Sequence, residues 1–166
     1  MFESFPTFSV NSASPSGDLI PAQAGLLAIF DVTAHSNEDI TFENGDGNSL
    51  VVNISQSVND SNLVTETFTL KNSTGTTLDT ATAGIESATS MTFDFANNSF
   101  TVPAGQTKQL YIYGDTRELE DDGDTVQLWL DDASETNVDW GIDGADGTAD
   151  TNNSYNHATV IFRGDI

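Results

Sequence analysis

The stretch Phe100–Leu130, FTVPAGQTKQLYIYGDTRELEDDGDTVQLWL, decides how this chain folds. Its apolar residues alternate with polar ones in three short segments. A Pro-Ala-Gly-Gln turn at 103–106 separates the first two segments, and an acidic loop at 115–124 precedes the third. Alternation at every second residue is typical of strands with one buried face. We therefore expect consecutive antiparallel strands, with the core in the strands and the charge in the loops.

The same alternation recurs on both sides of that stretch. Further candidate strands cover residues 7–12, 25–34, 39–43, 50–54, 64–70, 91–95, 138–140 and 158–162. Within 25–34, we expect one face to hold Leu26, Ala28, Phe30, Val32 and Ala34. The other face adds Leu27 and Ile29, so we expect the first half of this strand to be covered on both sides. Turn residues occupy 14–17, 44–47 and 72–75. No window of useful length holds a helical 3.6-residue period. The sequence predicts an all-β fold: one antiparallel β-sandwich domain, residues 1–166, with about eight to ten strands and long acidic loops.

The chain is strongly acidic. It carries 26 Asp and Glu against 4 Lys and Arg, a formal net charge of −22. Such a surface repels nucleic acid and anionic membranes, which are therefore excluded as partners. No segment approaches the ~20 apolar residues of a membrane-spanning helix, so we expect no membrane insertion. The absence of cysteine excludes disulfides, thiolate metal sites and cysteine nucleophiles.

The loop that follows the second strand of the opening stretch is the first candidate metal site. Six carboxylates crowd it: Asp115, Glu118, Glu120, Asp121, Asp122 and Asp124. Ca²⁺ takes six to eight oxygen ligands, and a flexible acidic loop supplies them well. Binding would also relieve the repulsion among the six acids. The alternative is a solvated loop that needs no ion.

A second acidic segment follows in the region 131–157, which we expect to be a long acidic loop. In DWGIDGADGTAD the candidate calcium ligands are Asp139, Asp143, Asp146 and Asp150. The spacing lacks the Asp-x-Asp-x-Asp-Gly order of an EF-hand and its closing Glu. The length of the loop favours an ordering ion or a functional role.

Three aromatic residues alternate with the apolar positions of the opening stretch. If the apolar residues face the core, Tyr111, Tyr113 and Trp129 share the opposite face and meet across neighbouring strands. Such a patch would stack on sugars of surface glycans or dock another subunit or module. The alternative is that the chain beyond residue 131 folds over the three rings and buries them.

The first ten residues hold three phenylalanines, Phe2, Phe5 and Phe8. This Phe-rich start is a candidate exchangeable strand (residues 1–10) that a neighbour could accept by strand addition. The start lacks the basic flank and the apolar length of a signal peptide, so export would require that a signal has been removed.

Catalytic chemistry has little support in the sequence. His35 and His157 are far apart and lie in no catalytic motif, and no Gly-x-Ser-x-Gly elbow is present. A carboxylate pair for glycoside hydrolysis is always available in so acidic a chain, so its presence carries almost no information. We expect that the protein is not an enzyme.

Several segments resemble a known class of module. FPTF at 5–8, SPSG at 14–17, AIFDVTA at 28–34 and FTVPAGQT at 100–107, followed by YGD at 113–115, are similar to immunoglobulin-like modules of large bacterial and archaeal cell-surface proteins. The resemblance covers most of the length from residue 6 to residue 130. It implies an immunoglobulin-like sandwich, an extracellular location and a structural or adhesive role, and it implies no catalytic residues.

These observations combine into one expectation with two alternatives. We expect a non-catalytic module of a surface-layer or adhesin-type protein, stabilised by Ca²⁺, whose partners are sibling modules or identical subunits. The first alternative is a filament or surface-lattice subunit that assembles by donating its N-terminal strand. The second is a carbohydrate-binding module that uses the aromatic patch.

Overall fold

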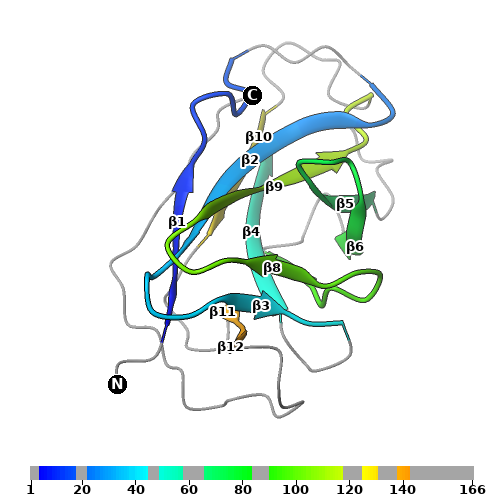
Figure 1. Ribbon diagram of the computed structural model, residues 1–166. Coiled ribbons are helices and arrows are strands. Elements are labelled where there is room, and N and C mark those ends of the chain that lie inside the picture. Colours follow the sequence, from blue (N-terminus) through cyan, green and yellow to red (C-terminus); the bar gives the residue numbers. More distant parts are fainter. Residues whose placement is uncertain are drawn as a thin grey trace.

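Figure 1 shows the computed structural model of the chain. The structure describes residues 4–17, 22–44, 49–57, 66–83, 90–117, 125–130 and 138–142. Within these ranges all regular structure is β-strand, and every strand pair is antiparallel. No helix long and apolar enough to cross a membrane occurs in them. The predicted all-β, antiparallel fold is confirmed.

The largest sheet has five strands in the order β1-β2-β9-β5-β6 (Figure 1). Their bounds are β1 Pro6–Val10, β2 Gly25–Ala34, β9 Thr107–Gly114, β5 Glu66–Asn72 and β6 Thr77–Ala83. Only β1 and β2, and β5 and β6, are neighbours both in sequence and in the sheet. The centre of the sheet therefore depends on the long-range pairing of β2 with β9 and of β9 with β5.

Two smaller sheets complete the fold. In the first, β4 (Ser49–Ser57) pairs with β7 (Ser90–Phe93), β10 (Thr125–Leu130) and β11 (Val138–Asp139). The second has the order β12-β3-β8, with bounds β12 Gly141–Ile142, β3 Ile40–Phe42 and β8 Phe100–Val102. Trp140 lies between β11 and β12, so the chain passes from one small sheet to the other at this buried side chain.

The three sheets enclose one hydrophobic core. Alternate residues are buried in several strands, as in β9, where Leu110 and Ile112 are fully buried and Tyr111 and Tyr113 are only partly so. The largest fully buried side chains come from all three sheets: Phe30, Phe42, Phe93, Phe95, Ile40, Leu50, Ile54, Leu70, Leu78, Leu110, Ile112 and Val32. Residues from both ends of the described chain thus share one interior.

A β-bulge corrects the expected face of β2. The register with β9 shifts between Leu26 and Ala28, so that Leu27 is an extra residue in the strand. Leu27 is 4% exposed and belongs to the core, whereas Leu26 is only partly buried. The expectation that Leu26 shares a face with Ala28 is wrong, because strict alternation does not survive an inserted residue. Leu27 and Ile29 are both buried, in agreement with the expected cover of the first half of the strand.

The strand β6 has no counterpart among the predicted strands. The predicted turn at 72–75 is present, with Gly75 at φ 83° and Asn72 accepting two backbone N–H groups through its side chain. β6 then returns along β5 with a bulge at Leu78. Its alternation is weak because threonine and alanine fill most of the strand.

The strand order bears on the expected family. An immunoglobulin domain places its first two strands in one sheet beside its fifth and fourth. Here the ninth strand separates β2 from β5, so the immunoglobulin-like topology stays a prediction. The predicted strand at 158–162 lies outside the described residues.

Candidate functional site

The first acidic loop begins directly after β9, and its first carboxylate has a cationic partner. Arg117 Nε donates to both carboxylate oxygens of Asp115, at 2.9 and 3.1 Å, and the backbone N–H of Arg117 donates to one of them at 3.1 Å. Arg117 Nη2 completes the ion pair. These hydrogen bonds, the side-chain ones foremost, lower the pKa of Asp115 below its ordinary value of 3.8. The carboxylate form of Asp115 is therefore favoured, and its negative charge is compensated by Arg117.

Thr116 fixes the start of the same loop to the approach of β2. Its backbone N–H donates to the carbonyl of Ala22 at 2.8 Å, and its side-chain oxygen accepts the N–H of Ala22 at 2.9 Å. Thr116 is 1% exposed and lies against Gly25, where an added Cβ would come within 2.9 Å of the threonine side chain. Gly25 is therefore required for this close approach. The loop thus leaves the scaffold from a rigid point.

The other predicted ligands of this loop, Glu118 to Asp124, lie outside the described residues. Of the second set, Asp139 is in β11, where its backbone pairs with Ser49. Asp143, Asp146 and Asp150 also lie outside the described residues. Among the residues that are described, no three His, Asp or Glu side chains come together as a metal site would require. Calcium binding by the two loops stays a prediction.

The predicted aromatic patch is divided between two faces of the molecule. Tyr111 and Tyr113 lie on β9 in the five-stranded sheet, whereas Trp129 lies on β10, which pairs with β4 in another sheet. In each strand the aromatic residues alternate with buried core residues, so they point away from the common core on opposite sides. The expectation that the three rings meet across neighbouring strands is wrong. β10 belongs to a different sheet from β9, and the strand pattern alone does not reveal this.

The outer face of the five-stranded sheet carries Tyr111 and Tyr113 together with one cationic side chain, Lys71. Lys71 Nζ lies 5.1 Å above the centroid of the Tyr113 ring, a cation–π contact. Lys71 is opposite Tyr111 in the β5–β9 pair. The rest of this face is rich in threonine; Thr33 and Thr107 share a 2.7 Å side-chain hydrogen bond. A role for Tyr111 and Tyr113 in docking or glycan binding stays a prediction.

The N-terminal arm, which we define as Ser4–Ser14, lies along the outer edge of β2. Within it, β1 pairs with β2 from Pro6 opposite Ala34 to Val10 opposite Phe30. Phe5 and Phe8 are partly buried against the core. Phe2, the remaining predicted donor residue, lies outside the described residues. In this structure the Phe-rich segment is thus seated in its own chain.

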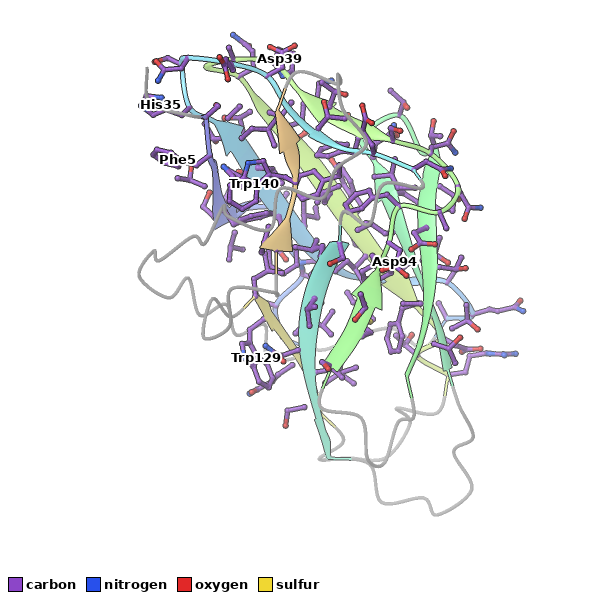
Figure 2. All side chains as sticks on the ribbon, turned by 90° about the horizontal axis from the view of Figure 1, so that it is seen from below. Phe5, His35, Asp39, Asp94, Trp129 and Trp140 are labelled. Atoms are coloured by element: carbon purple, nitrogen blue, oxygen red, sulfur yellow. The ribbon has the colours of Figure 1, made fainter. Side chains whose placement is uncertain are left out.

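The first residues of the N-terminal arm contact the rest of the domain. Ser4 Oγ lies 2.8 Å from the carbonyl oxygen of Glu38 and 3.1 Å from that of His35. Trp140 Nε1 donates to the carbonyl of Ser4 at 3.4 Å, and the Phe5 ring stacks on His35 at a centroid distance of 4.9 Å. Figure 2 shows Phe5, His35 and Trp140 gathered at one end of the molecule, with Trp129 elsewhere. The exposed His35 thus has a ring-stacking role here.

One buried carboxylate escaped the sequence analysis. Asp79 is 5% exposed on the edge strand β6, and its two oxygens accept the N–H groups of Thr80 at 2.7 Å and Asp94 at 2.6 Å. Asp31 and Asp39 are used in a similar way: they accept from the Asn11 side chain and from the Ala104 N–H, both within 2.9 Å. In the sequence, Asp79 is marked only as the acidic residue of an otherwise uncharged segment that follows the turn at 72–75.

No protein-family model matches this sequence, and a search of curated proteins finds no significant match.

Proposed function

We propose that this chain is a non-catalytic structural or adhesion module of a cell-surface protein, in the manner of the immunoglobulin-like modules that its sequence resembles. The observation that carries the proposal is how the described carboxylates are used. Asp79 and Asp39 accept backbone N–H groups, Asp31 binds the Asn11 side chain, and Asp115 binds Arg117. Asp79, Asp39 and Asp31 each fasten one strand or loop to another, whereas Asp115 fixes the start of its own loop. Polar groups used in this way stiffen a scaffold.

The proposal includes Ca²⁺ in the acidic loops at residues 115–124 and 139–150. An ion that bridges carboxylates there would hold both loops, and it would raise stability by mass action because it binds only the folded chain. The rigid start of the first loop at Thr116, which is anchored to Ala22, supports this mechanism. A loop that leaves from a fixed point loses less conformational entropy when an ion orders it.

The calcium part is tested by titration after chelation. We expect heat on addition of Ca²⁺ and a rise in melting temperature that grows with its concentration, beyond the rise in NaCl of matched ionic strength. A variant with Asp121, Asp122 and Asp124 changed to Asn removes the candidate ligands of the first loop. A variant with Asp143, Asp146 and Asp150 changed to Asn removes those of the second. No heat and an unchanged melting temperature in the unmodified chain would remove the metal and leave the scaffold role.

The cell-surface part is tested on the gene and on the cell. The reading frame that encodes this chain should carry an export signal together with sibling modules or an anchor. An antibody against the folded domain should label intact cells. Labelling only after lysis would contradict the proposed location.

A second candidate function is a self-assembling subunit of a filament or surface lattice. The observation that favours it is the place of β1: this strand occupies an edge of the largest sheet, and among the described strands its partner is β2. Light scattering of the purified chain across a wide concentration range tests this function. A monomer at every concentration would count against it.

A further inference from the structure

We propose that the N-terminal arm, Ser4–Ser14, is exchanged between copies of this chain, so that the arm of one copy lies along β2 of the next in the register observed here. The inference rests on the second proposed function, self-assembly, and names its partner and its joint. The partner is a second copy of this chain. The joint is the edge of β2 together with the backbone at 35–38.

The edge of β2 and the backbone at 35–38 form one strip, to which the N-terminal arm is hydrogen-bonded along its whole length. Ser4 bonds the carbonyls of His35 and Glu38, and the Phe5 carbonyl accepts the His35 N–H at 3.1 Å. At the other end, Asn11 donates to the Ile29 carbonyl at 3.0 Å, and the Ile29 N–H donates to Ser14 Oγ at 3.1 Å. Between them runs the β1–β2 ladder. A strand from a neighbouring copy would satisfy the same groups.

The strip would be left exposed without the N-terminal arm. Phe8 is opposite Val32 and Val10 is opposite Phe30, and both β2 residues belong to the buried core. An empty β2 edge would expose that apolar row together with a line of unpaired backbone groups, which is a template for strand addition. The apolar side chains of the arm repeat with the period of that row, so the same segment of a second copy fits it.

The exchange would keep the contacts at both described ends of the connection between the N-terminal arm and β2. Ser14 is hydrogen-bonded to Ile29, and Ala22 is hydrogen-bonded to Thr116. Gly17 in this connection has φ 92° and no atom within 4 Å of an added Cβ. The contacts of an exchanged arm would equal those of the resident arm.

The opposite edge of the same sheet is closed. The Leu78 carbonyl on β6 accepts N–H groups from Asn97 and Asn98, and Asn98 Nδ2 donates to the Thr77 carbonyl at 2.7 Å. Asp79 turns its carboxylate back onto the Thr80 N–H at 2.7 Å. An inward-pointing charge and a covering loop are devices that block edge-to-edge pairing. Strand addition to this sheet is thereby directed to the β2 edge.

A cysteine pair tests the exchange directly, because the chain has no cysteine of its own. Thr7 and Thr33 are directly opposite each other in the β1–β2 pair, with Thr7 Oγ1 3.4 Å from the Thr33 carbonyl. We expect the T7C/T33C variant, refolded at high concentration and oxidised, to give covalent oligomers on a denaturing gel that reductant dissolves. The matched control is T69C/T80C, which spans the β5–β6 pair and should give monomers.

The outcomes separate this joint from self-assembly in general. Disulfide-bonded T7C/T33C monomers at every concentration overturn the exchange. If the unmodified chain still assembles, self-assembly stands on another joint; if it does not, both fail. A second measurement serves if the variant does not fold. A chain lacking residues 1–14 should gain melting temperature on addition of a synthetic peptide of residues 4–14, and a scrambled peptide should have no effect. No response to the native peptide also overturns the proposal.

Discussion

The carboxylate of Asp79 accepts the backbone N–H of Asp94 at 2.6 Å and so joins the edge of the five-stranded sheet to the end of β7 in another sheet. Its second oxygen accepts the Thr80 N–H at 2.7 Å. A carboxylate that is 5% exposed is costly unless its oxygens are hydrogen-bonded. Here both oxygens are hydrogen-bonded, and the contact between Asp79 and Asp94 acts as a clasp that joins the two sheets.

Removing that clasp should destabilise the fold. Asp79→Ala removes the charged acceptor of the Asp94 N–H, and a hydrogen bond to a charged group contributes about 1.5–3 kcal/mol to the free energy of unfolding. Asp79→Asn keeps one acceptor oxygen and should cost less. Urea denaturation followed by circular dichroism measures both. Thr80→Ala, at an exposed neighbouring side chain, should stay within about 0.5 kcal/mol of the unmodified chain. Equal effects at the two positions would contradict the clasp.

A glycine at the end of β9 should resist enlargement. A Cβ added at Gly114 would come within 2.8 Å of Leu27 Cδ1 and 3.0 Å of the Phe68 ring, and both side chains are 4% exposed. Overpacking of this kind costs about 1–3 kcal/mol. Gly114→Ala should therefore lower the urea midpoint.

The partner of that glycine supplies the control. In a Leu27→Ala background the added methyl enters the space that leucine vacates, so the double variant should be more stable than the sum of the single effects predicts. A coupling of at least about 0.5 kcal/mol is expected for residues in contact. Strict additivity would show that Gly114 is not crowded by Leu27.

Phe95 combines full burial with a left-handed backbone. It is 0% exposed, its ring stacks on Phe42 at a centroid distance of 4.8 Å, and its φ is 53°. Replacing Phe95 with glycine or alanine should lower the free energy of unfolding by several kcal/mol, about 3–5 for alanine. Because glycine alone adopts positive φ without strain, Phe95→Gly should be roughly 0.5–1 kcal/mol more stable than Phe95→Ala.

Phe93, two residues earlier in β7, is the matched control because it is equally buried in an ordinary strand. There the order should reverse, with alanine more stable than glycine by roughly 0.5–1 kcal/mol. Thermal unfolding of the four variants gives the comparison. The same order at both positions would show that the backbone of Phe95 carries no strain.

Sequence periodicity was sufficient for the strands whose apolar residues are large. β2 and β9 are dense in Leu, Ile, Phe and Tyr, and both were predicted because large apolar residues at every second position are typical of a strand with a buried face. β6 was missed since Thr and Ala fill it and neither marks a buried face. The Leu27 bulge was missed because an inserted residue breaks the period on which the prediction relies.

Sheet membership was the second limit. Trp129 was placed beside Tyr111 because β9 and β10 follow each other in sequence, yet they pair with β2 and β4 in different sheets. Which sheet a strand joins depends on long-range pairing, and alternation within a strand is silent about it. The buried carboxylate of Asp79 escaped for a related reason, since its partner Asp94 comes from another sheet.

The ion pair at the start of the acidic loop gives a pH-dependent prediction. The pKa of Asp115 is lowered in the folded chain, chiefly by its side-chain hydrogen bonds with Arg117. A carboxyl whose pKa is lowered by folding stabilises the fold above its ordinary pKa of 3.8, and this contribution is lost as the pH falls through the lower folded value. Arg117→Ala should therefore destabilise the chain at pH 7 and should leave its stability unchanged at a pH below the folded value.

The size of that effect is set by exposure. The Arg117 side chain is 57% exposed and that of Asp115 is 19% exposed, so solvent screens the pair and its loss should cost no more than about 1 kcal/mol at low salt. Raising the salt concentration should shrink the difference further. Arg117→Lys keeps the charge but not the bidentate hydrogen bonds, so its stability should lie between that of the unmodified chain and that of Arg117→Ala. Urea midpoints of the three chains from pH 7 to pH 3 measure the trend; a gap that persists undiminished at the acid end would mean that Arg117 acts by packing rather than through Asp115.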